Sequence, residues 1–206
     1  MSANPVIFAM DLEGVLVPEI WIAVSEKTGI EKLRLTTRDI PDYGELMKGR
    51  LKILRENNLT LLDIQEVIEK VNPLPGSIEF LNWARSCIQV IILSDTFYEF
   101  AYPLMKKLGY PTLFCNSLEV DRRNIIVDYQ LRQKDGKRKS VVAFKKLGFS
   151  VISIGDSYND TTMLREADLG ILFRPPENVE KEFPEFEVFN EYGEVKSFIE
   201  EYLIVP

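Results

Sequence analysis

The sequence predicts an α/β protein with a doubly wound parallel sheet, and three observations carry this prediction. Short apolar runs recur along the 206 residues, and the first three are followed by Asp, Ser-Asp or Gly-Asp. The segments between the runs space their apolar residues as helices do. The stretch from Pro18 to Pro75, between the first and second runs, has helical patterns but no convincing strand. The predicted fold therefore includes an inserted helical cap over the sheet.

Four apolar runs predict strands that are buried on both faces. The runs are rich in β-branched and aliphatic residues, and they are nearly continuous rather than alternating with polar residues, which is typical of a parallel sheet. They cover residues 6–10, 88–93, 151–154 and 170–173. Residues 118–131 instead predict a small β-hairpin with its turn near Arg123 and Asn124.

Helical spacing separates the predicted strands. Thr60 and Asp63 form a start that resembles a capping box for one of these helices. Strands that alternate with helices imply right-handed crossovers and helices on both faces of the sheet. We therefore expect an α/β core of residues 1–16 and 76–206, with a helical cap of residues 17–75. The predicted helices are 44–57, 60–71, 77–86, 97–108, 139–147, 159–167 and 194–203.

Composition excludes several classes of chemistry. The chain has no histidine, so Ser-His-Asp triads, Cys-His pairs and HExxH zinc sites are ruled out. The net charge of -7 argues against general nucleic-acid binding. No apolar stretch approaches the ~18 residues of a membrane span, and we see no signal peptide. Cys87 and Cys115 form no CxxC motif, so we expect two buried thiols in a reduced cytoplasmic protein.

Polar residues follow three of the predicted strands. They are Asp11 with Glu13, Ser94 with Asp95, and Asp156 with Asn159 and Asp160. Each set alone is compatible with an ordinary turn or helix cap. The carboxyl ends of parallel strands lie at one edge of the sheet, however, where open α/β sheets bind ligands. Carboxylates gathered there suit phosphoryl chemistry with Mg²⁺.

The order of these motifs resembles the haloacid dehalogenase phosphatase superfamily, and the inserted cap resembles its phosphoserine phosphatase branch. Within that branch the similarity is to bacterial enzymes that combine phosphoserine phosphatase with phosphoserine:homoserine phosphotransferase. It rests on the segments DLEGVLVPEIW, TTRDIPDY, ILSDTFYEF, YQLRQKD and GDSYNDTTML.

The resemblance implies a role for each matching residue. Asp11 matches the nucleophile that becomes an aspartyl-phosphate, and Glu13 matches the general acid and base. The implied Mg²⁺ ligands are Asp11, the backbone carbonyl of Glu13, and Asp156. Phosphate contacts fall to Ser94, Asp95, Asn159 and a lysine, for which Lys137 is favoured over Lys134. The implied contacts to the amino-acid part of the substrate are Glu19 for its ammonium and Arg50 for its carboxylate.

Two positions depart from many members of the superfamily. Glu13 replaces an Asp, and Asp95 replaces a Gly, so we expect only the backbone of Asp95 to face the ligand. Without the resemblance, Arg50 reads as an exposed charge on a helix, and the role of Tyr158 is open.

The implied substrates are phosphoserine and homoserine, with neither nucleic acid nor membrane as a partner, and the resemblance is compatible with a homodimer. The alternatives are a phosphatase for another small phosphomonoester and a non-catalytic phosphate-binding regulator.

Overall fold

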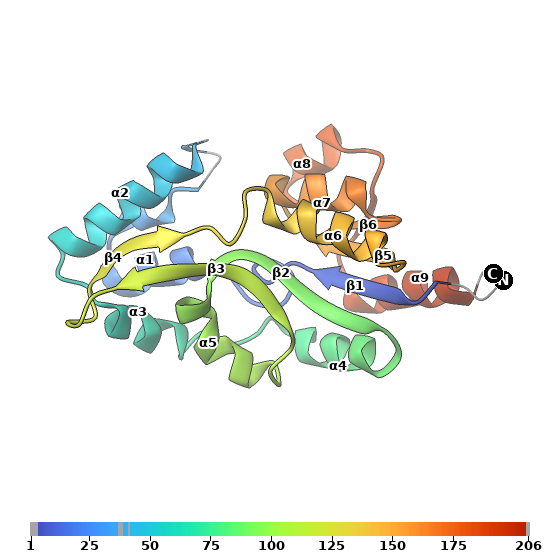
Figure 1. The fold of residues 1–206 in the computed structure, drawn as a ribbon, viewed down its shortest axis with the longest axis horizontal. Helices are drawn as coiled ribbons and strands as arrows, with labels where there is room; N and C mark the ends of the chain where they lie inside the picture. Colours follow the sequence, from blue (N-terminus) through green and yellow to red (C-terminus); the bar gives the residue numbers. More distant parts are fainter. Residues whose placement is uncertain (1–3, 37–38, 41, 205–206) are drawn as a thin grey trace.

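A seven-stranded sheet runs through the protein in the computed structural model, which describes residues 4–36, 39–40 and 42–204 (Figure 1). The strand order is β4-β3-β2-β1-β5-β6-β7, and all pairs are parallel except the antiparallel pair of β3 and β4. This confirms the predicted doubly wound sheet and the hairpin. The strands are β1 (Val6–Met10), β2 (Gln89–Phe97), β3 (Leu113–Val120), β4 (Ile126–Gln130), β5 (Ser150–Gly155), β6 (Leu169–Phe173) and β7 (Glu187–Phe189).

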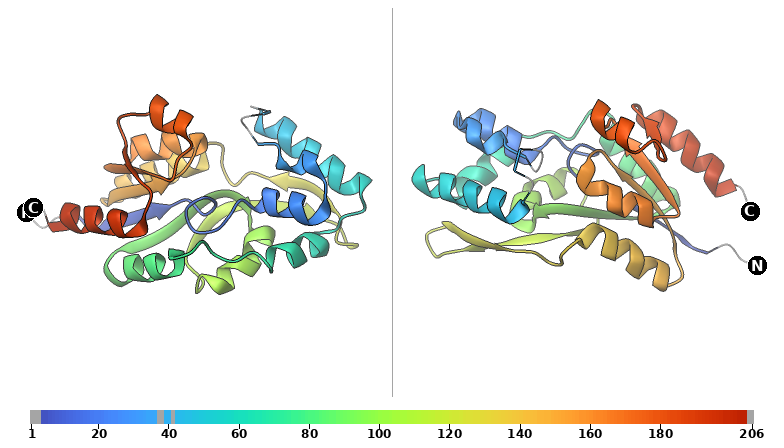
Figure 2. Two further views of the ribbon diagram at one scale, coloured as in Figure 1. Left: turned by 180° about the vertical axis from the view of Figure 1, so that it is seen from behind. Right: turned by 90° about the horizontal axis from the view of Figure 1, so that it is seen from above.

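Helices cover both faces of the sheet (Figures 1 and 2). One face packs against α4 (Ser77–Cys87), α5 (Tyr98–Lys107) and α9 (Tyr192–Ile204), and β1 contributes Phe8 and Met10 to that apolar cluster. The other face packs against α6 (Gly136–Lys146), α7 (Thr161–Glu166) and α8 (Glu177–Glu182), where β1 contributes Ile7 and Ala9. Burial on both faces explains why β1 reads as a continuous apolar run.

Helices are the only regular secondary structure in the described part of residues 18–75. They are α1 (Ile20–Thr28), the 3₁₀-helix η1 (Glu31–Arg34), α2 (Tyr43–Glu56) and α3 (Leu61–Ile68). In α3 the capping box between Thr60 and Asp63 forms as the sequence predicts. Apolar residues of these helices belong to the same cluster as Phe8 of β1, so one core joins them to the sheet. The division into core and cap remains a prediction. Thr37, Arg38 and Pro41 of TTRDIPDY lie outside the described residues.

Four local expectations differ from the structure. Strand β2 continues through Ser94 and Asp95 to Phe97. Helix α6 begins at Gly136, so Lys137 lies within its first turn rather than before it. Cys87 is exposed because α4 ends there, whereas Cys115 is buried in β3. Helix α8 and strand β7 were not predicted, because both are too short to establish a period.

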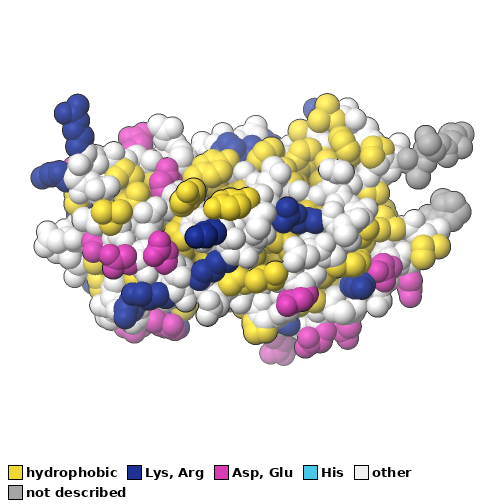
Figure 3. Space-filling view, turned by 90° about the horizontal axis from the view of Figure 1, so that it is seen from below, with side chains coloured by type: hydrophobic (Ala, Val, Ile, Leu, Met, Phe, Trp, Pro, Cys, Tyr) yellow, Lys and Arg dark blue, Asp and Glu magenta, His cyan; other side chains and the backbone are white. Residues whose placement is uncertain are grey.

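The surface seen from below carries charged side chains of both signs, with apolar side chains exposed between them (Figure 3). Helices α3, α4 and α5 cover this side of the sheet in Figure 1. Tyr98 and Tyr102 of α5 are among the large exposed apolar residues. None of the described helices is long and apolar enough to cross a membrane.

Candidate active site

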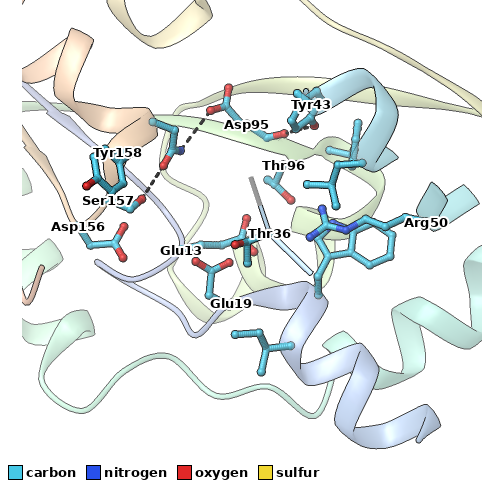
Figure 4. Close-up of a pocket in the computed structure, with 15 residues that line it drawn as sticks. Glu13, Glu19, Thr36, Tyr43, Arg50, Asp95, Thr96, Asp156, Ser157 and Tyr158 are labelled. Carbon is cyan, nitrogen blue, oxygen red and sulfur yellow. Dashed lines mark hydrogen bonds between the residues drawn. The ribbon is translucent and has the colours of Figure 1, made fainter. Parts of the chain in front are cut away.

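The carboxyl ends of β1 and β5 bring the first and last motifs together. Asp11 directly follows β1, and its N–H donates to the carbonyl of Ile154 in β5 at 2.9 Å. Asp156 directly follows β5. A cavity of about 340 Å³ opens beside them, lined by Glu13, Asp156 and Asn159 from the sheet edge and by Glu19 and Arg50 from the helical segment. Figure 4 shows Glu13 and Glu19 near its centre, with Asp156 and Arg50 on opposite sides.

Lys137 places a buried cation next to Asp11. Its Nζ donates to Asp11 Oδ1 and to Asp160 Oδ1, both at 2.7 Å, and the residue is only 4% exposed. Burial alone would lower the pKa of Lys137, but the charges of Asp11 and Asp160 raise that pKa well above its ordinary value. Lys137 therefore stays protonated. Lys134, the alternative lysine, is exposed.

Three carboxylates form a group that fits a divalent cation. Oxygen atoms of Asp11, Asp156 and Asp160 lie within 4.8 Å of one another. Burial, followed by the charge of Asp160, raises the pKa of Asp11 well above its ordinary value and that of Asp156 to about 7. A hard divalent cation would remove this mutual repulsion, and carboxylate oxygens are the ligands that Mg²⁺ prefers.

Asp160 supports this group rather than facing the cavity. It is fully buried, and its Oδ2 accepts the N–H groups of Asp156 and Ser157, each at 3.1 Å. Its Oδ1 already accepts from Lys137. Both oxygens of Asp160 are therefore engaged within the protein, whereas Asp156 borders the cavity.

A tight turn after β1 brings the chain close to Asp156. Gly14 has a φ of +79°, and its N–H donates to the carbonyl of Val17 at 2.8 Å. A Cβ at this position would collide with the carboxylate of Asp156. Gly14 therefore allows the turn to approach the proposed metal site.

Glu13 precedes α1, and its side chain reaches the first residue of that helix. Its Oε1 accepts the N–H of Ile20 at 2.7 Å, which fixes the direction of the carboxyl group. Burial, followed by the nearby charge of Glu19, raises the pKa of Glu13 to about 8. This raised pKa favours the protonated form of the Glu13 carboxyl group at neutral pH.

Strand β2 is irregular where it carries Ser94 and Asp95. Leu93 pairs with Phe114 and Phe97 pairs with Asn116, so β2 carries extra residues across this interval. We expected the Asp95 carboxylate to point away from the phosphate-binding residues, but the structure places it beside two of them. Its Oδ2 accepts from Asn159 Nδ2 at 3.3 Å and lies 3.9 Å from Lys137 Nζ.

Arg50 is 8% exposed, so it is not the exposed helix charge that its spacing alone favoured. The guanidinium lies over the ring of Trp21, 4.5 Å from its centroid, and one NH₂ group donates to the carbonyl of Leu35 at 2.7 Å. Burial lowers its pKa to about 10, which still leaves it charged at neutral pH. Its Nε is buried and has no acceptor among the described residues.

Sequence reasoning assigned no role to Tyr43 or Asn116, yet both contact the backbone of Asp95. The Tyr43 hydroxyl and the Asn116 Nδ2 donate to the Asp95 carbonyl at 3.2 and 2.9 Å. The sequence of β3, LFCNSLEV, contains other polar residues as well, so it does not single out Asn116. Tyr158 lines the cavity, and its hydroxyl contacts Glu182 of α8.

A family model described as haloacid dehalogenase-like hydrolase matches residues 6–168. The chain belongs to the haloacid dehalogenase-like hydrolases. It is 62% identical over 190 residues to "Phosphoserine phosphatase ThrH" of Pseudomonas aeruginosa, covering 92% of this chain and 93% of the relative. A phosphoserine phosphatase of Pseudomonas syringae pv. tomato is also 62% identical over 190 residues, covering 92% and 80%.

Solved structures of this hydrolase family share the fold. A structure described as a phospho-aspartyl intermediate analogue of phosphoserine phosphatase superposes with a TM-score of 0.73 at 18% sequence identity. The match covers 96% of this chain and 99% of that one. The similarity thus extends over the α1–α3 segment as well as the sheet.

Proposed function

We propose that this hydrolase is a Mg²⁺-dependent phosphoserine phosphatase that acts through an aspartyl-phosphate on Asp11. The observation that carries the proposal is that two groups of residues, each suited to a different part of phosphoserine, lie at the same site. Asp11 and the buried Lys137 form the end suited to a phosphoryl group, while Glu19 and Arg50 line the cavity where an ammonium and a carboxylate would bind. The two Pseudomonas relatives carry the name of this activity.

In the first step, Asp11 attacks the phosphorus atom. A carboxylate oxygen of Asp11 bonds to phosphorus while the bond from phosphorus to the serine oxygen breaks, and Glu13 donates its proton to that oxygen. Lys137 and Ser94 stabilise the charge on the phosphoryl oxygens. Mg²⁺, held by Asp11, Asp156 and the Glu13 carbonyl, would supply further positive charge at those oxygens.

In the second step, Glu13 is the base. It takes a proton from water, whose oxygen bonds to phosphorus as the bond to Asp11 breaks, which releases phosphate and restores Asp11. The hydroxyl of homoserine can replace water in the same step, and this gives phosphohomoserine. The transfer activity rests on the motif resemblance to the bifunctional branch.

The proposed location is the cytoplasm, with which the two free cysteines are compatible. Small-molecule substrates are the proposed partners.

Asp11→Asn tests the covalent step. We expect wild-type protein with Mg²⁺ to release phosphate from phosphoserine, and to form phosphohomoserine when homoserine is added. Asp11→Asn should lower both rates by about a thousandfold or more, because the nucleophile is lost. Asp128→Asn is the matched control, since Asp128 is exposed on β4 away from the cavity lining.

Wild-type turnover in Asp11→Asn would contradict the covalent step. Wild-type protein that releases phosphate from other monoesters but not from phosphoserine would indicate the alternative substrate class. No turnover of any phosphomonoester would support the non-catalytic regulator.

A further inference from the structure

Tyr43 connects helix α2 with strand β2, which carries Ser94 and Asp95. It is the first residue of α2, whose start is fixed because Asp42 Oδ1 accepts the N–H of Glu45 at 2.7 Å. The Tyr43 hydroxyl donates to the carbonyl of Asp95 at 3.2 Å, a contact between residues far apart in the chain. Figure 4 places Tyr43 beside Asp95 at the edge of the cavity.

Aromatic packing holds the Tyr43 ring in place. The ring meets Tyr129 of β4 edge to face at a centroid distance of 5.9 Å. Tyr129 in turn meets Phe97 of β2 at 6.1 Å. Edge-to-face pairs at these distances are favourable, so the hydroxyl has a defined position relative to β2.

Asn116 holds the same carbonyl from within the sheet. Its Nδ2 donates to the Asp95 carbonyl at 2.9 Å, while its Oδ1 accepts the N–H of Arg132 at 3.0 Å. Asn116 is only 5% exposed. The carbonyl therefore has one donor from the sheet and one from α2, and the contact from Asn116 would persist without the Tyr43 hydroxyl.

Tyr43 and Arg50 occupy the same helix two turns apart. Residues at this spacing lie on one face, separated by ~10 Å along the axis. Both line the cavity. A helix end anchored at Asp95 thus fixes how far the Arg50 guanidinium stands from Ser94 and Lys137.

We infer that Tyr43 is a positioning residue for substrate selection: through the Asp95 carbonyl it sets the distance between the phosphate-binding end of the site and the carboxylate-binding Arg50. This inference rests on the proposed phosphoserine activity. It predicts that Tyr43 affects substrates with a carboxylate and leaves the phosphoryl chemistry itself nearly unchanged.

Tyr43→Phe removes the hydroxyl and keeps the ring. We expect kcat/KM for phosphoserine to fall about tenfold, mainly because KM rises. A tenfold fall is the size of effect expected from the loss of one hydrogen bond. For phosphoethanolamine, which lacks only the carboxylate, the fall should be below about twofold. Inhibition by inorganic phosphate should stay at the wild-type level. Tyr129→Phe is the matched control, because it removes a hydroxyl from the same aromatic group without touching Asp95.

A double-mutant cycle separates positioning from a general structural effect. If Tyr43 acts by placing Arg50, then Tyr43→Phe in an Arg50→Ala background should cost less than about twofold in phosphoserine kcat/KM, because the carboxylate contact is already gone. A second tenfold fall would overturn the inference, as would equal losses on phosphoserine and phosphoethanolamine or no loss on phosphoserine. Wild-type protein inactive on phosphoserine would instead contradict the proposed function.

Discussion

At the scale of single residues, the site depends on charged groups that are buried and would be costly there without one another. Asp11, Asp160 and Lys137 are all buried, and their charges are compensated mainly by one another. Removing one member of such a group leaves the others uncompensated. In the proposed function, the same electrostatic arrangement that costs solvation would prepare Asp11 to receive a phosphoryl group beside the fixed cation of Lys137.

Gly14→Ala tests whether Gly14 is needed for Mg²⁺ binding beside Asp156, as distinct from a general effect on folding. The new methyl group would collide with the Asp156 carboxylate and displace it. A shift of about 1 Å at a reacting centre lowers a rate by roughly a hundredfold, so we expect activity to fall by that order. Weaker activation by Mg²⁺ in steady-state titrations would accompany it.

Gly29→Ala provides the matched control for backbone strain. Gly29 has a φ of +71°, similar to that of Gly14, but a Cβ there would meet no atom within 4 Å. This variant should lose stability without losing Mg²⁺ activation. Equal activation profiles for the two variants would argue against the role of Gly14 beside Asp156.

At the scale of secondary-structure elements, the start of α3 offers a stability test away from the site. The Thr60 hydroxyl accepts the N–H of Asp63 at 3.3 Å, and Asp63 Oδ2 accepts the N–H of Thr60 at 2.7 Å. Thr60→Ala should lower the free energy of unfolding by about 1 kcal/mol. That corresponds to a decrease in Tm of about 2–4 °C for a chain of this size, measured by thermal denaturation.

Ser197→Ala is a suitable comparison for that prediction. Ser197 lies within α9, and its hydroxyl only donates back to the carbonyl of Gly193 in the same helix. Its removal should leave Tm nearly unchanged. A Thr60→Ala variant as stable as Ser197→Ala would mean that the capping box contributes nothing.

Elements with a long, regular pattern were predictable from the sequence, and short or irregular ones were not. Continuous apolar runs identified β1 and β5 because both their faces are buried. The extension of β2 past Leu93 could not be predicted, because it depends on how β3 pairs with it. In the same way, the sequence motifs indicated Asp11 and Lys137. The contact of Tyr43 with Asp95 could not be predicted, because it depends on tertiary packing between residues far apart in the chain.

At the scale of the whole molecule, cation binding should stabilise the fold. Burial, followed by repulsion from Asp160, raises the pKa values of Asp11 and Asp156, and a bound cation would offset both effects. At Mg²⁺ concentrations about 100 times Kd, binding to the native state adds ~2.7 kcal/mol, or about 5–10 °C in Tm. Thermal denaturation in Mg²⁺ against a chelator measures this shift.

Asp156→Asn should abolish most of the Mg²⁺-dependent shift while raising Tm in the chelator, because one repelling charge is gone. Asp168→Asn is a comparison at an acidic residue outside the group of three carboxylates. A shift of equal size in wild type and Asp156→Asn would place the cation elsewhere.

The central position of β1 has a consequence for the order in which the protein forms. Ile7 pairs with Gln89 on one side and with Val151 on the other, so the first strand to be synthesised has both of its partners much later in the chain. Contacts of such high sequence separation slow folding, because long loops must close before they form. On the ribosome, β1 and Asp11, the proposed nucleophile that follows it, must wait for β5 to emerge before that pairing can form. A truncated chain that lacks β5 would therefore leave one side of β1 unpaired and could not bring Asp11 and Asp156 together.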